Sequence, residues 1–513
     1  MNGAEALLGS LVAGGIEVCF MNPGTTEIHL VEALDRVRGL RDVACLFEGV
    51  ASGAADGYAR MTGKPASTLF HLGPGLSNAL ANLHNACRAT VPMVNIVGDH
   101  ATFHRPLNPP LASDIEAIAR PFSRWLKTSW TAADVGREGA EAVAAARTAP
   151  GRIATLVVPS DAAWSEGGGI TGPVAPPAPD LPAPSRIEDA ARLLRNGERA
   201  AILLGSHMMQ GPALTAAGRI ASATGAKLLA PFAFARMERG DGRPCVERIA
   251  YVTEQAMAQL AEFRQLILVG APEPVAFFGH PTRPGRLAPE GCRVFTLAAA
   301  VEDCAGALTA LADALDARDA APHLQAAEER IAPHGAITLE GIARAVAAAL
   351  PENVIVVDES ITSGRGLMAA TRGAPPHDWL VNTGGSIGLG TPLAVGAALA
   401  APDRPVLCLE GDGSFMYTPQ ALWTAARESL ALTTIVFANR SYQILKGELA
   451  ALETNPGPRA EAALDIAPPA IDFIALSKSL GAPAVRVADL EEFTAALRRG
   501  LASREPNLIE VPL

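Results

Sequence analysis

The chain has 513 residues, of which 49% are hydrophobic, and this length predicts about three domains with large buried cores. A net charge of −11 without any lysine-rich or arginine-rich run argues against nucleic acid as a partner, and no apolar run is long enough to span a membrane. The first residues lack the basic region of a signal peptide, and seven scattered cysteines fit free thiols, so we expect a cytoplasmic protein.

The first block, residues 1–165, alternates strand and helix patterns. Short apolar runs predict strands, and helical patterns fill the gaps between them. The predicted strands are residues 17–20, 43–47, 67–70 and 91–97. This alternation is typical of a parallel α/β sheet.

Two residues of the first block follow predicted strands. Glu48 follows the second strand and precedes a run of small residues, which allows backbone or a ligand to approach closely. A glutamate at such a junction is usually a charge that satisfies the helix dipole. His71 ends the third strand, where a lone histidine is more often a structural hydrogen bonder.

Two further blocks follow. Residues 166–186 are rich in glycine and proline and predict a surface linker. A second α/β block covers residues 187–332, and a third covers residues 333–513. The third block includes a predicted strand at residues 353–357.

The third block contains a more specific pattern. An apolar strand at 405–410 is followed by Gly-Asp-Gly-Ser, then by Thr418 and Pro419 as the predicted start of a helix over 421–430. A strand at 433–438 comes next and leads to Asn439. A lone Gly-Asp-Gly is most simply a tight turn. Here Asp412 and Asn439 fall at carboxyl ends of parallel strands, where α/β sheets bind ligands, and their oxygens suit Mg²⁺.

This strand–helix–strand pattern resembles the cofactor motif of enzymes that use thiamine diphosphate (ThDP). The resemblance implies that the side chains of Asp412 and Asn439 and the carbonyl of Ser441 hold Mg²⁺ against the diphosphate. The run that begins at Glu48 also looks like that family. By resemblance, Glu48 hydrogen-bonds the aminopyrimidine ring and so assists formation of the C2 carbanion.

The resemblance implies further cofactor contacts. Residues 382–392 are similar to the family's glycine-rich stretch, and Ile387 falls where a bulky side chain supports the bent cofactor. The other expected cofactor contacts are Asn78, Gly385, Gly411, Gly413, Ser414 and Tyr442.

The family's architecture is also implied. It consists of three doubly wound parallel-sheet α/β domains: a pyrimidine-binding (PYR) domain, expected at 1–165, a central domain, expected at 187–332, and a diphosphate-binding (PP) domain, expected at 333–513. In this family the site forms between two chains, so we expect at least a homodimer and predict a homotetramer.

The surroundings of His71 and of residues 22–25 resemble benzoylformate decarboxylase. In that enzyme a histidine at this place relays protons, and Thr25 stands where it has a serine hydroxyl. His280, which follows a Gly-Ala-Pro run, corresponds loosely to its second catalytic histidine. The resemblance implies decarboxylation of a 2-oxo acid through an enamine, with release of an aldehyde.

Two positions after Asn439 depart from benzoylformate decarboxylase, and a third departs from pyruvate decarboxylase. Ile444 and Glu448 replace an alanine and a phenylalanine of its substrate pocket, and Leu445 lacks the catalytic acid that pyruvate decarboxylase has there. The sequence therefore leaves the 2-oxo acid substrate open.

Other functions remain as alternatives. An acetolactate-synthase-like carboligase is the first, although this chain has Gly98-Asp99-His100 where that enzyme has Gly-Gln. We also find no counterpart of its flavin-binding arginine motif, so FAD is not expected. A non-catalytic homologue would be expected to lack Glu48 or Asp412. A dinucleotide-binding protein would need an acidic residue about 20 positions after its glycines, which is missing.

Overall fold

The computed structural model describes residues 1–451 and 456–513. The prediction of an α/β protein with parallel sheets in three domains is confirmed. The chain divides into two compact units, each taken here by itself. The first unit consists of residues 1–177, 330–371 and 382–513, and the second of residues 178–329 and 372–381. The domain boundaries expected from the sequence stay a prediction.

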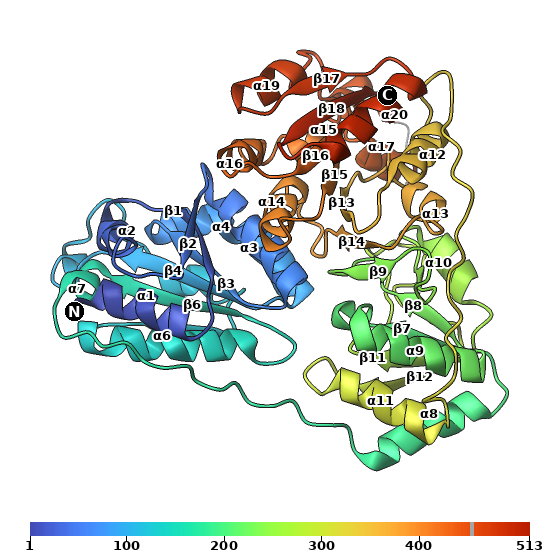
Figure 1. Cartoon of the computed structure of the whole chain (residues 1–513), viewed down its shortest axis with the longest axis horizontal. Coiled ribbons are helices and arrows are strands. Elements are labelled where there is room, and N and C mark those ends of the chain that lie inside the picture. The colour runs from blue at the N-terminus through green and yellow to red at the C-terminus, as the bar shows by residue number, and fades with distance from the viewer. Residues whose placement is uncertain (452–455) are drawn as a thin grey trace. The chain divides into compact units, whose positions relative to one another are not determined.

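The first unit begins with a six-stranded parallel sheet in the order β2-β1-β3-β4-β6-β5 (Figure 1). Its strands are β1 (Val18–Asn22), β2 (Arg41–Ala44), β3 (Ala66–Phe70), β4 (Met93–Asp99), β5 (Trp125–Thr128) and β6 (Ile153–Pro159). The helices are α1 (Gly3–Ala13), α2 (Ile28–Ala33), α3 (Glu48–Thr62), α4 (Leu72–Ala89), α5 (Ile115–Ala119), α6 (Ala132–Arg147) and α7 (Ser160–Trp164). β3, β4 and β6 are buried along their whole length, as expected of apolar strands covered on both faces.

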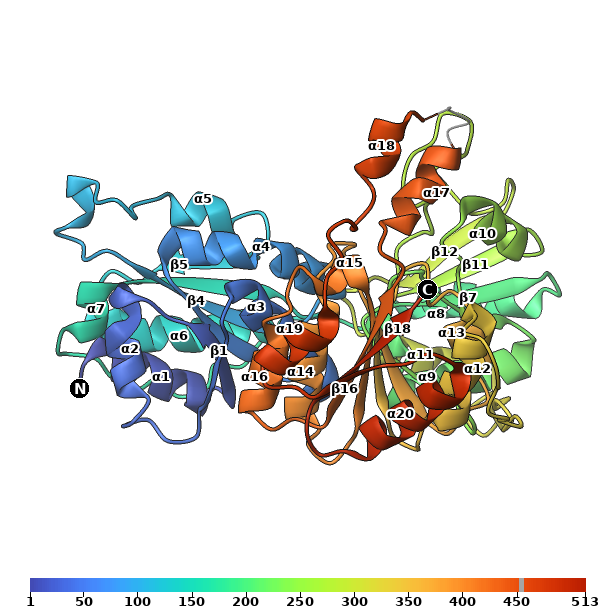
Figure 2. The ribbon, with the colours of Figure 1, turned by 90° about the horizontal axis from the view of Figure 1, so that it is seen from above.

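The same unit contains a second run of parallel strands in the order β17-β18-β16-β15-β13. These are β13 (Ile355–Glu359), β15 (Val406–Gly411), β16 (Leu432–Ala438), β17 (Ala484–Arg486) and β18 (Asn507–Pro512). The helices are α12 (Leu339–Ala349), α13 (Leu367–Ala370), α14 (Gly390–Ala400), α15 (Asp412–Phe415), α16 (Ala421–Arg427), α17 (Gln443–Ala451), α18 (Pro458–Ala462), α19 (Phe473–Ser479) and α20 (Leu490–Ala502). Figure 2 shows α17 and α18 standing apart from β16 and β18.

The second unit has a five-stranded parallel sheet in the order β10-β8-β7-β11-β12 and an antiparallel pair, β9 and β14. Its strands are β7 (Ala200–Leu204), β8 (Lys227–Ala230), β9 (Met237–Arg239), β10 (Glu247–Arg248), β11 (Gln265–Val269), β12 (Arg293–Ala298) and β14 (His377–Val381). Its helices are α8 (Pro184–Arg195), α9 (Gly211–Thr224), α10 (Thr253–Leu260) and α11 (Cys304–Ala314).

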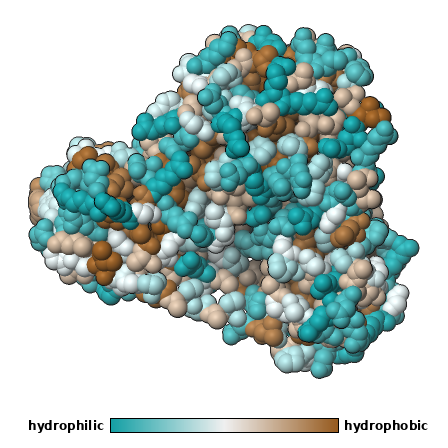
Figure 3. Space-filling view, viewed as in Figure 1, coloured by the Kyte–Doolittle hydropathy of each residue, from teal (hydrophilic) through white to brown (hydrophobic). Residues whose placement is uncertain are grey.

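None of the helices in residues 1–451 and 456–513 is both long and apolar enough to cross a membrane. On the face of the molecule in Figure 3, hydrophobic side chains lie interspersed with hydrophilic ones.

The bounds of several predicted elements differ from the structure; the strand predicted over 91–97 is β4 at Met93–Asp99, and the helix predicted over 421–430 ends at Arg427. The predicted start of a helix at Thr418 and Pro419 is wrong, because α16 begins at Ala421 and the Thr418 hydroxyl donates to the carbonyl of Gly388 at 2.9 Å. β2 ends at Ala44, so the predicted strand over 43–47 extends too far. The predicted strand over 353–357 is shifted, because β13 continues to Glu359.

Helices α3 and α14 lie side by side in the first unit and approach unusually closely (Figure 1). A Cβ atom at Gly57 of α3 would lie 2.0 Å from the carbonyl oxygen of Leu393, and one at Gly396 of α14 would lie 1.9 Å from that of Ala54. Both neighbours are backbone atoms, which cannot rotate away. Glycine at these two positions therefore sets the distance between the helices.

We expect Gly57→Ala to lower the free energy of unfolding by about 1–3 kcal/mol, because the added methyl group forces the two backbones apart. Without such a neighbour, the same change within a helix stabilises by about 0.5–1 kcal/mol. Gly447→Ala in α17 is the matched control, since no other part of residues 1–451 and 456–513 comes within 4 Å of its Cβ position, apart from its chain neighbours and its own helix backbone. Urea denaturation of both variants tests the prediction, and equal stability of the two would contradict it.

Candidate functional site

Glu48 lies at the carboxyl edge of the first sheet. It is the first residue of α3, it follows β2, and its side chain is 7% exposed. The amide of Asn78 on α4 donates to Glu48 Oε2 at 3.0 Å. A Cβ atom at Gly75 would lie 3.0 Å from Oε1, so glycine keeps that side of the carboxylate open. The structure thus holds a buried acid at a strand end with one oxygen bonded and the other available.

His71 follows β3 at the same edge of the sheet, beside an acid that the sequence did not single out. Glu27 is fully buried, and its Oε2 lies 2.8 Å from His71 Nδ1 and accepts the amide hydrogen of Gly24 at 2.8 Å. A Cβ atom at Gly98 would lie 1.7 Å from Glu27 Oε1, so the carboxylate needs a glycine there. Because a carboxylate accepts hydrogen bonds, it places the histidine proton on Nδ1 and leaves Nε2 as an acceptor.

The hydroxyl group nearest His71 differs from the expected one. Thr25 opens a short 3-10 turn and is exposed. The hydroxyl of the next residue, Thr26, lies 3.4 Å from His71 Nδ1 and also donates to Glu27 Oε1. The role expected of Thr25 stays a prediction.

Asp412 and Asn439 follow the adjacent parallel strands β15 and β16. Asp412 is 2% exposed, and its two oxygens accept the amide hydrogens of Gly413 at 2.8 Å and of Arg440 at 2.6 Å. Asn439 Oδ1 accepts the amide hydrogen of Ser441 at 3.0 Å. Arg440 has φ +56°, a left-handed conformation that residues other than glycine rarely adopt.

These groups fit a divalent cation and a diphosphate. Desolvation raises the pKa of Asp412 despite its two backbone hydrogen bonds, so a cation here would offset the cost of burying the charge. One carboxylate, one amide oxygen and one backbone carbonyl are hard ligands of the kind Mg²⁺ takes, with phosphate oxygens completing the shell. A Cβ atom at Gly413 would lie 2.7 Å from the ring of Tyr442, so the close packing of this ring against the turn requires glycine. Ser414 is buried, and Gly411 is the N-cap residue of α15.

The loop between Asn382 and α14 carries Ile387, which is half-buried. The Asn82 amide of α4 donates to the carbonyls of Gly49, next to Glu48, and of Gly388, next to Ile387, at 2.8 and 3.2 Å. Asn85 of the same helix exchanges two hydrogen bonds with the backbone of Ser386. The loop is therefore tied to the helix that follows His71.

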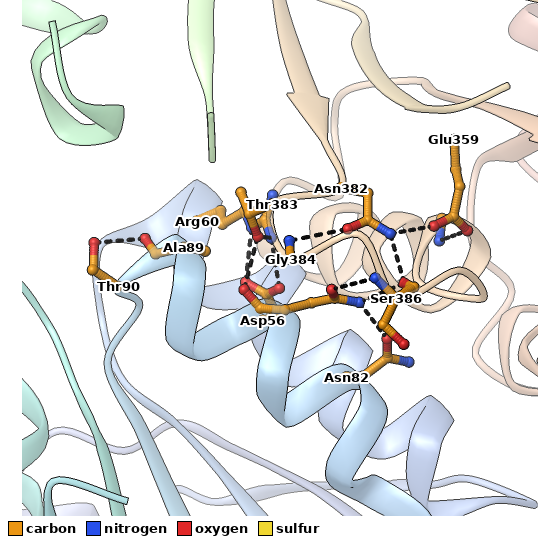
Figure 4. Close-up of polar contacts among 12 residues, drawn as sticks. Asp56, Arg60, Asn82, Ala89, Thr90, Glu359, Asn382, Thr383, Gly384 and Ser386 are labelled. Atoms are coloured by element: carbon orange, nitrogen blue, oxygen red, sulfur yellow. Dashed lines mark hydrogen bonds and ion pairs between the residues drawn. The ribbon is translucent and has the colours of Figure 1, made fainter. Parts of the chain in front are cut away.

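A buried ion pair borders this loop (Figure 4). Asp56 and Arg60 on α3 have fully buried side chains and form a two-pronged pair at 2.7 and 2.8 Å. Arg60 also donates to the hydroxyl of Thr383 at 3.1 Å. Removal of the Arg60 charge would leave the buried Asp56 carboxylate without its cation.

Three expected pocket residues lie on α17, which has no buried residue. Leu445 is 46% exposed, Glu448 is exposed and Ile444 is half-buried.

Two other expected site residues lie elsewhere. Gly385 is exposed with φ +80°. His280 belongs to the second unit, where its Nδ1 accepts the amide hydrogen of Thr282 at 3.2 Å.

Two buried acids, Glu359 and Glu410, were also missed by sequence reasoning. They face each other in register on β13 and β15 and are 2% and 0% exposed. Glu410 Oε1 accepts from the amide and hydroxyl of Thr391 at 2.6 and 2.8 Å. Its Oε2 has no hydrogen-bond partner among the described residues. Desolvation, reinforced by the Glu359 carboxylate, raises the pKa of Glu410 well above 4.5.

This pKa shift predicts a pH-dependent stability. A carboxyl group whose pKa is higher in the fold contributes stability that is complete below its unfolded pKa and is lost as pH rises through the folded value. We expect the unfolding free energy of the cofactor-free wild type to fall, relative to Glu410→Gln, as pH rises from the ordinary glutamate pKa into the alkaline range. Urea denaturation across this range measures the difference, and identical pH profiles would contradict the prediction.

Comparisons with known proteins agree with this arrangement. A family model described as "Thiamine pyrophosphate enzyme, N-terminal TPP binding domain" matches residues 1–116, and "Thiamine pyrophosphate enzyme, C-terminal TPP binding domain" matches residues 362–511. The chain is 51% identical over 513 residues to "Putative acetolactate synthase large subunit IlvX" of Mycobacterium tuberculosis, which covers 100% of this chain and 99% of that protein.

Two decarboxylases are more distant. The chain is 27% identical over 532 residues to benzoylformate decarboxylase of Pseudomonas aeruginosa, with 97% of this chain and 96% of that protein covered. A solved structure, the thiamine diphosphate-dependent 4-hydroxybenzoylformate decarboxylase of Rhodococcus jostii RHA1, superposes with a TM-score of 0.86 at 25% identity, covering 100% of this chain and 99% of that one.

Proposed function

Because this chain belongs to the family of thiamine-diphosphate-dependent enzymes, we propose that it decarboxylates a 2-oxo acid non-oxidatively, with Mg²⁺, and releases an aldehyde. The observation that carries this proposal is the contact between the buried Glu27 and the partly exposed His71, at the sheet edge that also bears Glu48. Release of an aldehyde requires a proton at the former carbonyl carbon, and a histidine with a fixed tautomer is suited to deliver it.

When bound, thiamine diphosphate supplies a carbon nucleophile and an electron sink for the departing carboxylate. Asp412, Asn439 and the Ser441 carbonyl would hold Mg²⁺ and the diphosphate. Glu48, oriented by Asn78, would hold a proton shared with the aminopyrimidine ring.

Other residues would handle the substrate. His71 Nε2 would first take up a proton from solvent, giving an imidazolium beside the Glu27 carboxylate, and would then deliver that proton to complete the aldehyde. Thr25 would bind the substrate carboxylate, and His280 would assist proton transfer. Ile444, Leu445 and Glu448 would border the substrate. We also propose that the protein assembles from at least two chains, as a homotetramer, and that it is located in the cytoplasm.

Glu27→Gln tests the part assigned to His71. We expect kcat to fall about 10- to 100-fold with a smaller change in KM, because the amide no longer holds the Nδ1 proton as a carboxylate does. Steady-state kinetics with the preferred 2-oxo acid measures kcat and KM separately. An unchanged kcat would remove the pair from the mechanism.

A carboligase of the acetolactate synthase type is the second candidate, favoured by the name of the relative at 51% identity. In that reaction a second carbonyl compound, rather than a proton, is added to the same carbon. Pyruvate with ThDP and Mg²⁺ distinguishes the two functions. Acetaldehyde as the product supports decarboxylation, and acetolactate supports carboligation.

A further inference from the structure

One carboxylate fixes the backbone that follows Ile387. Glu359 Oε2 accepts the amide hydrogens of Gly388, Leu389 and Gly390 at 3.0, 3.0 and 2.9 Å. These amides stand at the start of α14, where helix N–H groups have no partner within the helix and favour a negative charge. The position of this turn is therefore set by Glu359, at the end of β13.

The same carboxylate also acts on the backbone that precedes Ile387. Glu359 Oε1 accepts a hydrogen bond from the side-chain NH₂ group of Asn382 at 2.6 Å (Figure 4). The same NH₂ group also donates to the backbone carbonyl of Ser386 at 2.6 Å. Asn382 Oδ1 in turn accepts the amide hydrogens of Gly384 and Gly385 at 3.1 and 2.8 Å. Both sides of Ile387 are thus connected to one buried side chain.

We propose that Glu359 is a positioning residue for the cofactor: its carboxylate sets the backbone around Ile387 and thereby the support that Ile387 gives to bound ThDP. The inference rests on the proposed function, because it takes Ile387 as the side chain beneath the cofactor. Glu359 itself need not touch the cofactor.

Glutamine cannot replace Glu359 in this network. If the amide oxygen accepts the three backbone N–H groups, the NH₂ group meets the NH₂ group of Asn382, and both are donors. If the amide is turned over, the NH₂ group meets the three backbone donors. Either orientation leaves buried donors unpaired.

Glu410 offers a matched control on the neighbouring strand. It is equally buried, but only its Oε1 is needed as an acceptor, and its Oε2 has no hydrogen-bond partner in residues 1–451 and 456–513. A glutamine NH₂ group can occupy the Oε2 position without displacing a donor. Glu410→Gln therefore changes a buried acid in the same layer without disturbing the loop.

The test is a double-mutant cycle between Glu359→Gln and Ile387→Ala, with Glu410→Gln as the control. Two quantities are measured in the full-length protein with Mg²⁺: the dissociation constant of ThDP by calorimetry, and the rate of H/D exchange at C2 of the bound cofactor by NMR. Thermal unfolding of each variant checks that it folds.

We expect E359Q and I387A each to slow the exchange about 10- to 100-fold, and the double variant to be no slower than the slower single variant, because both changes act through one contact. E410Q should stay within about twofold of wild type. If the fold-decreases in exchange rate of the two single variants multiply in the double variant, or if E359Q exchanges at the wild-type rate, the inference is overturned.

The controls separate this inference from the proposed function. If E359Q does not fold, Glu359→Asp, which keeps the charge but shortens the reach, replaces it in the cycle with the same expected non-additivity. If wild-type protein neither binds ThDP nor accelerates the exchange, the proposed function fails. If the wild type does both and E359Q behaves like E410Q, only the role of Glu359 is lost.

Discussion

Glu48→Gln should slow H/D exchange at C2 of bound ThDP about 10²- to 10⁴-fold, the range that a positioned acid or base contributes. Glutamine keeps the size of the side chain and can still accept the hydrogen bond from Asn78. It cannot share a proton with the aminopyrimidine ring as a carboxylate does. The loss should therefore appear in the exchange rate more than in the affinity for ThDP.

The exchange is measured by NMR on protein saturated with ThDP and Mg²⁺. Glu188→Gln is the control, because this exposed glutamate of α8 undergoes the same chemical change away from the site. Exchange in E48Q at the wild-type rate would show that Glu48 is not the acid that activates the cofactor.

Asp412→Asn should weaken Mg²⁺-dependent binding of ThDP by at least about 100-fold, because the change removes the one charged protein ligand expected at the metal. The variant keeps the shape of the side chain. Its NH₂ group must, however, face the amide of either Gly413 or Arg440, and both are donors. The turn that presents Asn439 should therefore loosen as well.

Calorimetric titration of ThDP at several Mg²⁺ concentrations measures this effect. Asp403→Asn, at an exposed position before β15, is the matched control and should bind as the wild type does. An unchanged Mg²⁺ dependence in D412N would remove Asp412 from the proposed metal site.

The sequence indicates site residues where these directly follow a predicted strand. The apolar runs that became β15 and β16 end directly before Asp412 and Asn439, so the chain itself indicated a shared sheet edge. Glu48 also follows a predicted strand and is the first residue of α3, but its expected role came from the resemblance of the run that begins there to the ThDP family. Strand ends were predicted less accurately, because a buried polar residue such as Glu359 looks like the end of an apolar run.

The residues that the sequence did not reveal act through distant contacts. Glu27 reads as an ordinary acid of a short turn until β3 brings His71 beside it. Glu359 becomes interpretable only when the loop before α14 folds onto its carboxylate. Thr418 was misassigned for the same reason, because its hydroxyl bonds to Gly388 rather than to its own helix. No local pattern encodes these pairings.

The central claim is tested most directly by CO₂ release from a panel of aliphatic and aromatic 2-oxo acids, each assayed with and without ThDP and Mg²⁺. We predict that at least one acid is converted to CO₂ and the corresponding aldehyde only when both are present. Release of CO₂ with a ligated hydroxy-keto acid as the sole product, or no turnover of any acid by protein that binds ThDP, would contradict the account.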